Sequence, residues 1–249
     1  MKYKNVAYSI IGFILIIFLW TFISIIIDEQ KLVFPGPLST LNAFIKLLSL
    51  KSTYLSIFYS LFKMIVGYGC ACLLALILGI LAGLNKWLYK ILHPLMLILK
   101  SIPTAALIFL FIVMAGFDNS PIFVVILVSF PILYEAFYSG IKNIPNDIND
   151  VISLDGGSSI KNIINVRIPF AKNYIILGIT SSFALAFKVE IMAEVLSGAT
   201  IKGIGCSIKI IQATTSDMSG IFAWSMIAVI LLLIITYLSN LIKKHFNNQ

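Results

Sequence analysis

The feature that most constrains this chain is a series of long apolar stretches without charge. Val6–Ile27 contains 22 residues with no Asp, Glu, Lys or Arg, and Met218–Ile242 contains 25. A helix needs about 20 consecutive apolar residues to cross the hydrocarbon layer of a bilayer. Of the 249 residues, 60% are hydrophobic and only 11% are charged, too few to cover a water-facing surface. The chain is therefore predicted to be an all-α, polytopic membrane protein.

Six segments are predicted to span the membrane, within a single transmembrane domain that covers residues 1–249. The spans are residues 6–27, 64–84, 94–116, 121–138, 173–196 and 218–242. The first exceeds the length of a typical signal-peptide core and has no A-x-A-like cleavage site after it, so it is interpreted as a retained span. Gly79 and Gly83 have the spacing of a close helix–helix contact. Pro131 is expected to interrupt the fourth span.

The distribution of positive charge predicts the orientation of these spans. With the N-terminus inside, the inner segments hold more Lys and Arg than the outer ones, which predicts a cell-membrane protein with both termini in the cytoplasm. The outer lysines would be Lys31, Lys46, Lys51, Lys63, Lys202 and Lys209. The net charge of +8 is attributed to topology and to anionic membrane lipid, and not to nucleic acid.

The longest predicted cytoplasmic connection, residues 139–172, is expected to form two short helices. The first would begin near Pro145, because proline suits the first turn of a helix. It would stop at Gly156-Gly157, where glycine can adopt the left-handed conformation of a C-cap. Ser158 or Ser159 would cap the second helix, and Pro169 would end it.

The first short helix carries an unusual number of aliphatic residues for a segment in water. They are Ile148, Val151, Ile152 and Leu154. An exposed apolar patch of this kind indicates a partner protein, and a helix lying in a groove would cover it. The alternative is that these residues pack against the protein's own helix ends. The residues alone favour neither.

The same loop resembles the coupling loop of ABC importer permeases. The family pattern reads E-A-A, three residues, G, nine residues, I-x-L-P, and Asp150-Val151-Ile152, Gly156 and Pro169 occur at its separations. Asp replaces the family Glu, and Val and Ile replace the two Ala. Further stretches resemble the nitrate/sulfonate/taurine branch: Pro35-Gly36-Pro37, His93-Pro94 with Lys100–Ala106, Gly156-Gly157-Ser158, and Phe187–Glu194 with Gly203-Ile204-Gly205.

The resemblance implies a type I importer permease fold and a set of partners. A second permease copy would complete a homodimer, two ABC ATPase subunits would dock on the coupling helices of the two copies, and an extracytoplasmic solute-binding protein would deliver the solute. The implied solute is a nitrate-, sulfonate- or taurine-like anion or a vitamin precursor. The sequence has no G-x-x-x-x-G-K-[ST] motif, so ATP is expected to be hydrolysed by the partner, with no cofactor or metal on this chain.

The resemblance also assigns the coupling residues. Contact with the ATPase would involve Ile148, Asp150, Val151, Ile152, Leu154, Gly156, Gly157 and Pro169. Asp150 would pair with a basic residue of the ATPase. Val151 and Ile152 would fill an apolar groove.

Charged residues inside the fifth span are candidates for a transport pathway or gate. Ionisable side chains in a span normally face a charged partner or a water-filled cavity. We expect the same of Lys188, Glu190 and Glu194. Glu190 and Glu194 share a helix face, whereas Lys188 points away from Glu190. Structural pairing between spans is the alternative. Lys100 is expected to snorkel or to form a structural pair.

Two other functions compete with the permease interpretation. An ion-coupled secondary transporter could use the charged residues of the fifth span, although such proteins often contain internal repeats and none is recognisable between the two halves. A membrane enzyme would need a nucleophile–base pair or a cluster of metal ligands, and the sequence pattern indicates neither.

Overall fold

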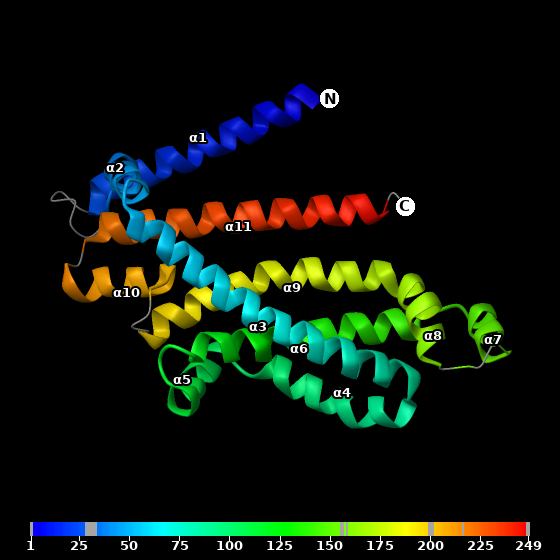
Figure 1. Ribbon diagram of the computed structural model, residues 1–249. Coiled ribbons are helices and arrows are strands. Elements are labelled where there is room, and N and C mark those ends of the chain that lie inside the picture. Colours follow the sequence, from blue (N-terminus) through cyan, green and yellow to red (C-terminus); the bar gives the residue numbers. More distant parts are fainter. Residues whose placement is uncertain are drawn as a thin grey trace.

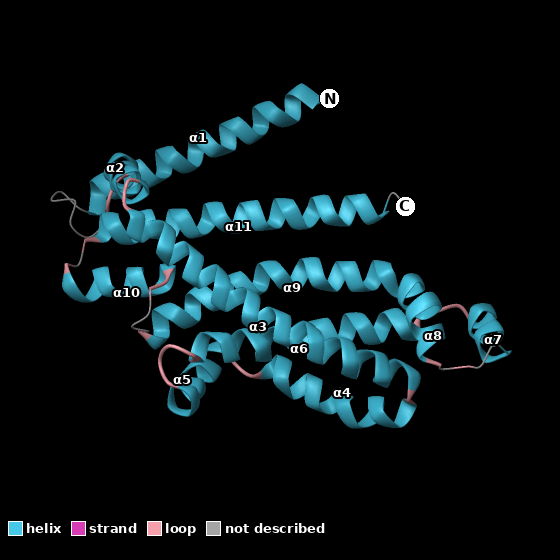
Figure 2. Ribbon diagram, in the orientation of Figure 1, coloured by secondary structure: helices cyan, strands magenta, loops and turns pink. Residues whose placement is uncertain are grey.

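The computed structural model describes residues 2–27, 34–154, 157, 159–198, 202–215 and 217–247, and these residues form helices and short connections without a strand (Figures 1 and 2). The elements are α1 (Lys2–Ile27), α2 (Pro37–Leu48), α3 (Lys51–Leu84), α4 (Lys86–Ser101), α5 (Thr104–Ala115), α6 (Ser120–Lys142), α7 (Asn146–Leu154), α8 (Ile160–Asn162), a π-helical turn (Ile163–Arg167), α9 (Ile168–Ser197), α10 (Ile204–Thr214) and α11 (Met218–Asn247).

Helices occupy all six places where spans are expected. Four of them are long and apolar enough to cross a bilayer: α3, α6, α11 and the continuous segment Ile160–Ser197. The third expected span is broken, because α4 and α5 meet at an angle of 98°. Pro103 explains the break, since a residue before proline avoids the helical region, and Ile102 is extended with ψ 127°.

Three details differ from the sequence-based expectations. Helix α3 begins at Lys51 and not near Met64, so Lys63 lies inside a span and not in an outer loop. Helix α6 runs through Pro131 without a break. Pro169 does not end a short helix but lies in the first turn of α9. The prediction that prolines stop these two helices is therefore wrong.

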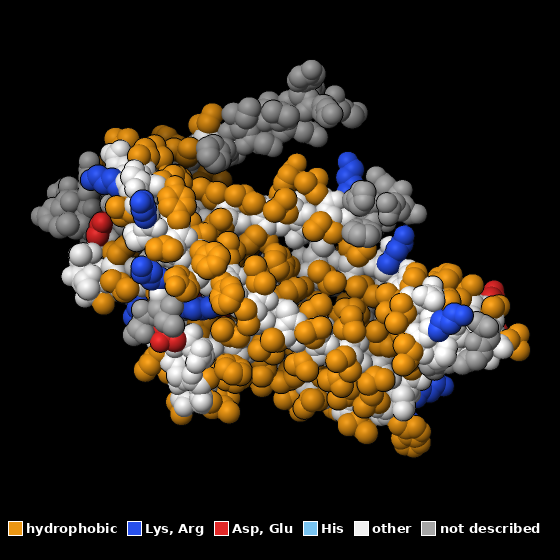
Figure 3. Space-filling view, in the orientation of Figure 1, with side chains coloured by type: hydrophobic (Ala, Val, Ile, Leu, Met, Phe, Trp, Pro, Cys, Tyr) orange, Lys and Arg blue, Asp and Glu red, His pale blue; other side chains and the backbone are white. Residues whose placement is uncertain are grey.

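The long helices lie side by side and form a bundle with short helices at each of its two ends (Figure 1). Helices α7 and α8 lie at one end, and α2 and α10 lie at the other. Both chain termini point toward the α7 end, and α1 diverges from α11 along its length. Figure 3 shows hydrophobic side chains over the middle of one face and most Lys and Arg toward the two ends, the pattern of a protein surrounded by lipid.

Glycines allow α3 to approach α6 closely. A Cβ atom on Gly79 would lie 2.7 Å from the Phe137 Cβ and 2.9 Å from the Tyr134 carbonyl oxygen. On Gly83 it would lie 2.7 Å from the Ile141 Cβ. The close contact predicted from the spacing of these two glycines is confirmed.

Replacing Gly79 with Ala is expected to lower the free energy of unfolding by about 1–3 kcal/mol, because the added methyl group has no room between the two backbones. Gly69→Ala is the matched control on the same helix, since a Cβ there meets nothing within 4 Å. Unfolding in mixed micelles would measure both variants. Equal stability of the two would contradict the close α3–α6 packing.

Candidate functional site

Helix α7, which holds the predicted coupling residues, stands apart from the helix bundle at one end of the molecule (Figure 1). It follows Pro145, whose carbonyl oxygen accepts a hydrogen bond from the Asn149 N–H at 3.1 Å. Beyond its last turn, the Gly157 N–H donates to the Ile152 carbonyl oxygen at 2.8 Å. Gly157 has the predicted left-handed conformation, with φ +64°. Gly156 lies outside the described residues.

The aliphatic residues of α7 divide between the protein's own interior and the surface. Ile152 is only 3% exposed and Ile148 is half-buried. Val151 is 63% exposed and Leu154 is 89% exposed. Asp150 is also exposed, next to Val151. The apolar surface offered to a partner is therefore smaller than the predicted set of four residues, and Ile152 anchors the helix to its own subunit.

A polar contact that the sequence did not indicate ties α7 to the long helix α9. The Arg167 guanidinium donates a hydrogen bond from Nη1 to Asn149 Oδ1 at 2.9 Å. Arg167 belongs to the π-helical turn that continues directly into α9. Pro169 is exposed in the first turn of α9. Helix α7 is therefore attached to the start of α9 both by this hydrogen bond and by a short connection.

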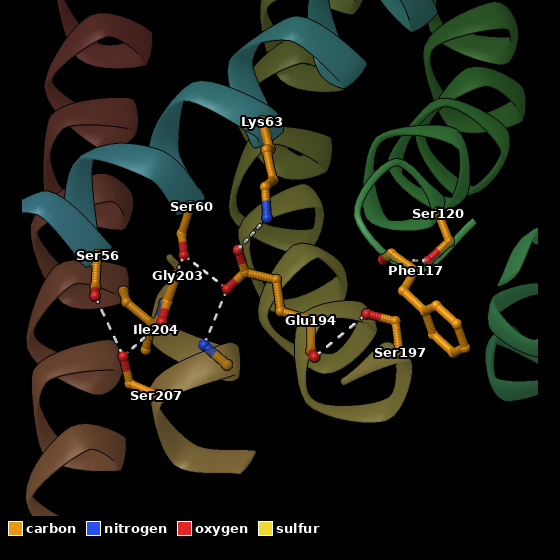
Figure 4. A network of polar contacts seen from close by, with 11 residues as sticks. Ser56, Ser60, Lys63, Phe117, Ser120, Glu194, Ser197, Gly203, Ile204 and Ser207 are labelled. Atoms are coloured by element: carbon orange, nitrogen blue, oxygen red, sulfur yellow. Dashed lines mark hydrogen bonds and ion pairs between the residues drawn. The ribbon is translucent and has the colours of Figure 1, made fainter. Parts of the chain in front are cut away.

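At the opposite end of α9, Glu194 forms a fully buried ion pair with Lys63 of α3 (Figure 4). The Nζ–Oε1 distance is 3.1 Å, and the two side chains are 6% and 0% exposed. The other carboxylate oxygen accepts hydrogen bonds from Ser60 Oγ at 2.7 Å and from the Gly205 N–H at 2.9 Å. Because every bond is charge-assisted, the buried carboxylate is well compensated. These residues are called the Glu194 cluster below.

The Glu194 cluster also fixes the start of α10. Ser60 Oγ accepts a hydrogen bond from the Ile204 N–H at 2.8 Å (Figure 4). A Cβ atom on Gly203 would lie 2.1 Å from Glu194 Oε1, and one on Gly205 would lie 2.5 Å from the Glu194 Cβ. The two glycines of Gly203-Ile204-Gly205 are therefore needed so that the backbone can approach the carboxylate. The cluster joins α3, α9 and α10.

Of the three pathway candidates of the fifth span, Glu190 and Glu194 are buried on one helix face and interact electrostatically, whereas Lys188 lies apart from them. Glu194 is bound to Lys63, which sequence reasoning had placed in an outer loop. Glu190 is 0% exposed, and its carboxylate has no hydrogen-bond partner among the described residues. Lys188 is exposed and lines a groove of about 220 Å³ between α9 and α11. Glu194 therefore forms a structural ion pair between two spans, which was the alternative to a role in a pathway or gate.

Lys100 forms the structural pair that was one of its two expected roles. Its Nζ contacts Glu135 Oε2, which connects the end of α4 to α6. The Lys100 and Glu135 side chains are 36% and 60% exposed, respectively. Glu135 was not singled out in the sequence, although it is a charge inside an apolar span, which is the signal that could have identified it.

Comparison with known proteins shows relatives among membrane transport proteins. The chain is 30% identical to the nitrate import permease protein NrtB of Synechocystis sp. over 172 residues, which are 68% of this chain and 60% of that protein. It is 33% identical to the bicarbonate transport system permease protein CmpB of Synechococcus elongatus over 150 residues, 59% of this chain and 52% of that one. The chain thus spans little more than half the length of these relatives.

Solved structures share the fold. An inward-facing structure of the MetNI methionine ABC transporter matches with a TM-score of 0.66 at 16% identity, over 76% of this chain and 94% of that chain. The structure of an amino acid ABC transporter matches with a TM-score of 0.63 at 15% identity, over 84% and 96% of the two chains. The expected type I importer permease fold is confirmed.

The family model of binding-protein-dependent transport system inner membrane components matches residues 75–248. This match covers well over half of the chain and includes α6, α7, α9 and the Glu194 side of the Glu194 cluster. The protein therefore belongs to the family of inner membrane components of binding-protein-dependent transport systems.

Proposed function

We propose that this chain is the permease subunit of an ATP-driven, binding-protein-dependent importer of a small solute, and that α7 is the helix on which a separate ABC ATPase acts. The observation that carries the proposal is the exposure of Val151 and Leu154 on a short helix that stands apart from the bundle (Figure 1). Large apolar side chains in this position need a partner to cover them. Asp150 beside them would pair with a basic residue of that partner.

The connection from α7 to α9 supports a mechanical role. Ile152 is buried and Arg167 bonds to Asn149, so α7 is attached to the start of the long helix. Helix α9 has 30 residues and is therefore about 45 Å long. ATPase closure would move α7, and α9 would carry that movement to the Glu194 cluster at its far end. ATP would be bound and hydrolysed by the partner alone.

The remaining features of the proposed importer follow from this arrangement. Both termini point toward the α7 end (Figure 1), which supports the predicted cytoplasmic position of the termini and of α7. The solute-binding protein would then dock at the end with α2 and α10. A second, identical copy would complete the pathway, with lipid around the outer faces. The nitrate and bicarbonate named in the relatives make small polar solutes the first candidates.

The test is to place a charge on the exposed face of α7. Val151→Asp, Leu154→Asp and Asp150→Lys are each expected to weaken ATPase attachment at least about tenfold, since a buried unpaired charge is costly at an interface, and to abolish uptake. Membrane insertion should be normal, because these side chains are exposed. Co-purification of the ATPase and uptake into proteoliposomes would measure both effects.

Val151→Leu is the matched control, because it keeps an apolar side chain at the same position and should retain the ATPase. Normal attachment by both aspartate variants would refute the coupling role of α7. Solute uptake by the chain without any ATPase, driven by a proton or sodium gradient, would instead identify an ion-coupled secondary transporter.

A further inference from the structure

An apolar groove of about 510 Å³ lies between α9 and α11, in the half of the bundle nearest α7, and Tyr68 of α3 forms part of its wall. Its lining residues run from Ile176 to Phe183 along α9 and from Ile235 to Ile242 along α11. Each of these stretches is about 10 Å long. The groove therefore fits within one leaflet of a hydrocarbon layer that is about 30 Å thick.

The groove is open to the surroundings of the chain. Two of its lining residues on α11, Leu238 and Ile242, are 52% and 51% exposed. On the α9 side, Ile176 and Ile179 are half-buried. A molecule can therefore reach the groove from outside, and an apolar surface of this kind needs an apolar molecule to cover it.

The polar side chains in the lining leave little for a polar ligand to bind. The Tyr68 hydroxyl donates a hydrogen bond to the Ile179 carbonyl oxygen at 2.8 Å. The Thr180 hydroxyl donates to the Ile176 carbonyl oxygen at 2.7 Å. Ser239 is only 7% exposed. A site for a polar solute offers polar groups that fix the solute, whereas this groove suits a hydrocarbon chain.

Two lysines lie at the end of the groove nearest α7. Lys172 precedes Ile176 by four residues on α9, and Lys243 follows Ser239 by four residues on α11, so each shares a helix face with a lining residue. Both lysines are half-buried, and neither forms an ion pair with a described residue. Figure 3 shows Lys and Arg side chains near this end of α9 and α11.

The two lysines lie at the same depth in the membrane. A separation of 25 residues divides Lys172 from Ser197 at the other end of α9, and the same separation divides Lys243 from Met218 at the start of α11. This length corresponds to about 37 Å of helix, which exceeds the hydrocarbon thickness of about 30 Å. Both ammonium groups therefore reach the layer of lipid headgroups, where they attract anionic lipid.

We propose that the groove between α9 and α11 binds an anionic phospholipid, with one acyl chain in the groove and the phosphate paired with Lys172 and Lys243. This ligand matches the apolar lining and the positive charge at one end of it. An apolar helix of a second copy would cover the lining but leave both lysines without a counter-charge. The bound lipid fills the space between α9 and α11 at the end where α7 is attached.

The experiment is native mass spectrometry of the full chain, freed of lipid in detergent and then given phosphatidylglycerol or phosphatidylcholine with the same acyl chains. One phosphatidylglycerol per copy is expected to bind at least about tenfold more tightly than phosphatidylcholine. Lys172→Gln and Lys243→Gln should each weaken phosphatidylglycerol binding about fivefold, the contribution of one lysine near an anionic lipid surface. The double variant should weaken it at least about twentyfold.

Lys142→Gln is the matched control for the lysine variants. Lys142 is exposed in the last turn of α6, at the same end of the bundle, and α6 does not line the groove. This variant should bind phosphatidylglycerol as the unaltered chain does. Melting temperatures in detergent should be equal for all these variants, because none of the three lysines forms an ion pair with a described residue.

Leu238→Trp tests the groove itself, because the larger side chain would occupy the space for the acyl chain. It is expected to weaken phosphatidylglycerol binding at least about fivefold. Leu233→Trp is the matched control on the same helix, since Leu233 is 63% exposed and does not line the groove. The control should leave lipid binding unchanged.

Three results would overturn the proposal: equal binding of the two phospholipids, unchanged phosphatidylglycerol binding in the double lysine variant, or displacement of the lipid by inorganic phosphate alone. The same spectra count the copies of the chain in each particle. A dimer that binds no phosphatidylglycerol and dissociates in Leu238→Trp but not in Leu233→Trp would show that the groove is an interface between copies, which would also overturn it.

Discussion

Replacing Glu194 with Gln, or Lys63 with Met, is expected to lower the free energy of unfolding by about 3–5 kcal/mol, because each change leaves the opposite charge buried without its partner. The pair is closed to solvent, with side chains 6% and 0% exposed, so water cannot compensate the remaining charge. Loss of this pair should also free the start of α10, since Ser60 and Gly205 bind the same carboxylate. Unfolding in mixed micelles would measure the change.

The double variant Lys63→Met with Glu194→Gln tests the physical cause. It removes both charges, and the Gln side-chain oxygen can still accept hydrogen bonds from Ser60 and Gly205. Its destabilisation should therefore be smaller than the sum of the two single variants by about 0.5–3 kcal/mol, the range of coupling for residues in contact. Strictly additive effects would mean that the two charges do not stabilise each other.

Glu190→Gln is the matched control for these variants. Glu190 is on the same helix and is as deeply buried as Glu194, but its carboxylate has no hydrogen-bond partner among the described residues. An isosteric change at this position breaks no hydrogen bond to a described residue but removes a carboxyl group that interacts electrostatically with Glu194 and Lys63, so its effect on the free energy of unfolding should be smaller than that of Glu194→Gln. A loss as large as that of Glu194→Gln would show that burial alone, and not the ion pair, causes the effect.

Replacing Gly205 with Ala is expected to be similarly severe, with a loss of about 3–5 kcal/mol from overpacking and from the weakened bond to the carboxylate. The new Cβ would lie 2.5 Å from the Ile191 carbonyl oxygen and 2.8 Å from the Val195 nitrogen. Both are backbone atoms of α9, which cannot rotate away. The Gly205 N–H would have to move from Glu194, which it now reaches at 2.9 Å.

Gly220→Ala provides the comparison for this variant. The atom closest to its new Cβ is the end of the Asp217 side chain, at 3.0 Å, and a side-chain end can move. Its cost should stay below about 1 kcal/mol. If Gly205→Ala and Gly220→Ala have equal melting temperatures in detergent, the close approach of α10 to α9 does not hold in solution.

Local chemistry along the chain was sufficient to predict much of this protein. A long run of apolar residues can only be placed in lipid or in a protein core. The positions of the spans could therefore be predicted from local composition, without knowing which helices pack against each other. Pro145 and Gly157 act on their own backbone, which is why the bounds of α7 were close to those observed. The spacing of Gly79 and Gly83 likewise indicated a contact face, and the resemblance in the loop indicated the family.

The local sequence did not predict correctly whether a helix ends at a proline. Pro131 lies inside α6, where neighbouring helices and local adjustments can satisfy the freed backbone group of a membrane span. Pro169 follows a π-helical turn, in which the regular hydrogen-bond pattern is already interrupted. In both places the lost backbone hydrogen bond is compensated or already absent, so the helix continues through the proline.

Only the tertiary structure decided which side chains meet. Glu194 and Lys63 are 131 residues apart, and Lys100 and Glu135 are 35 apart. A helical sequence determines where a side chain points relative to its own axis, but the residue opposite to it depends on how two helices pack and rotate against each other. For the same reason, Ile152 is buried whereas its neighbour Val151 is exposed.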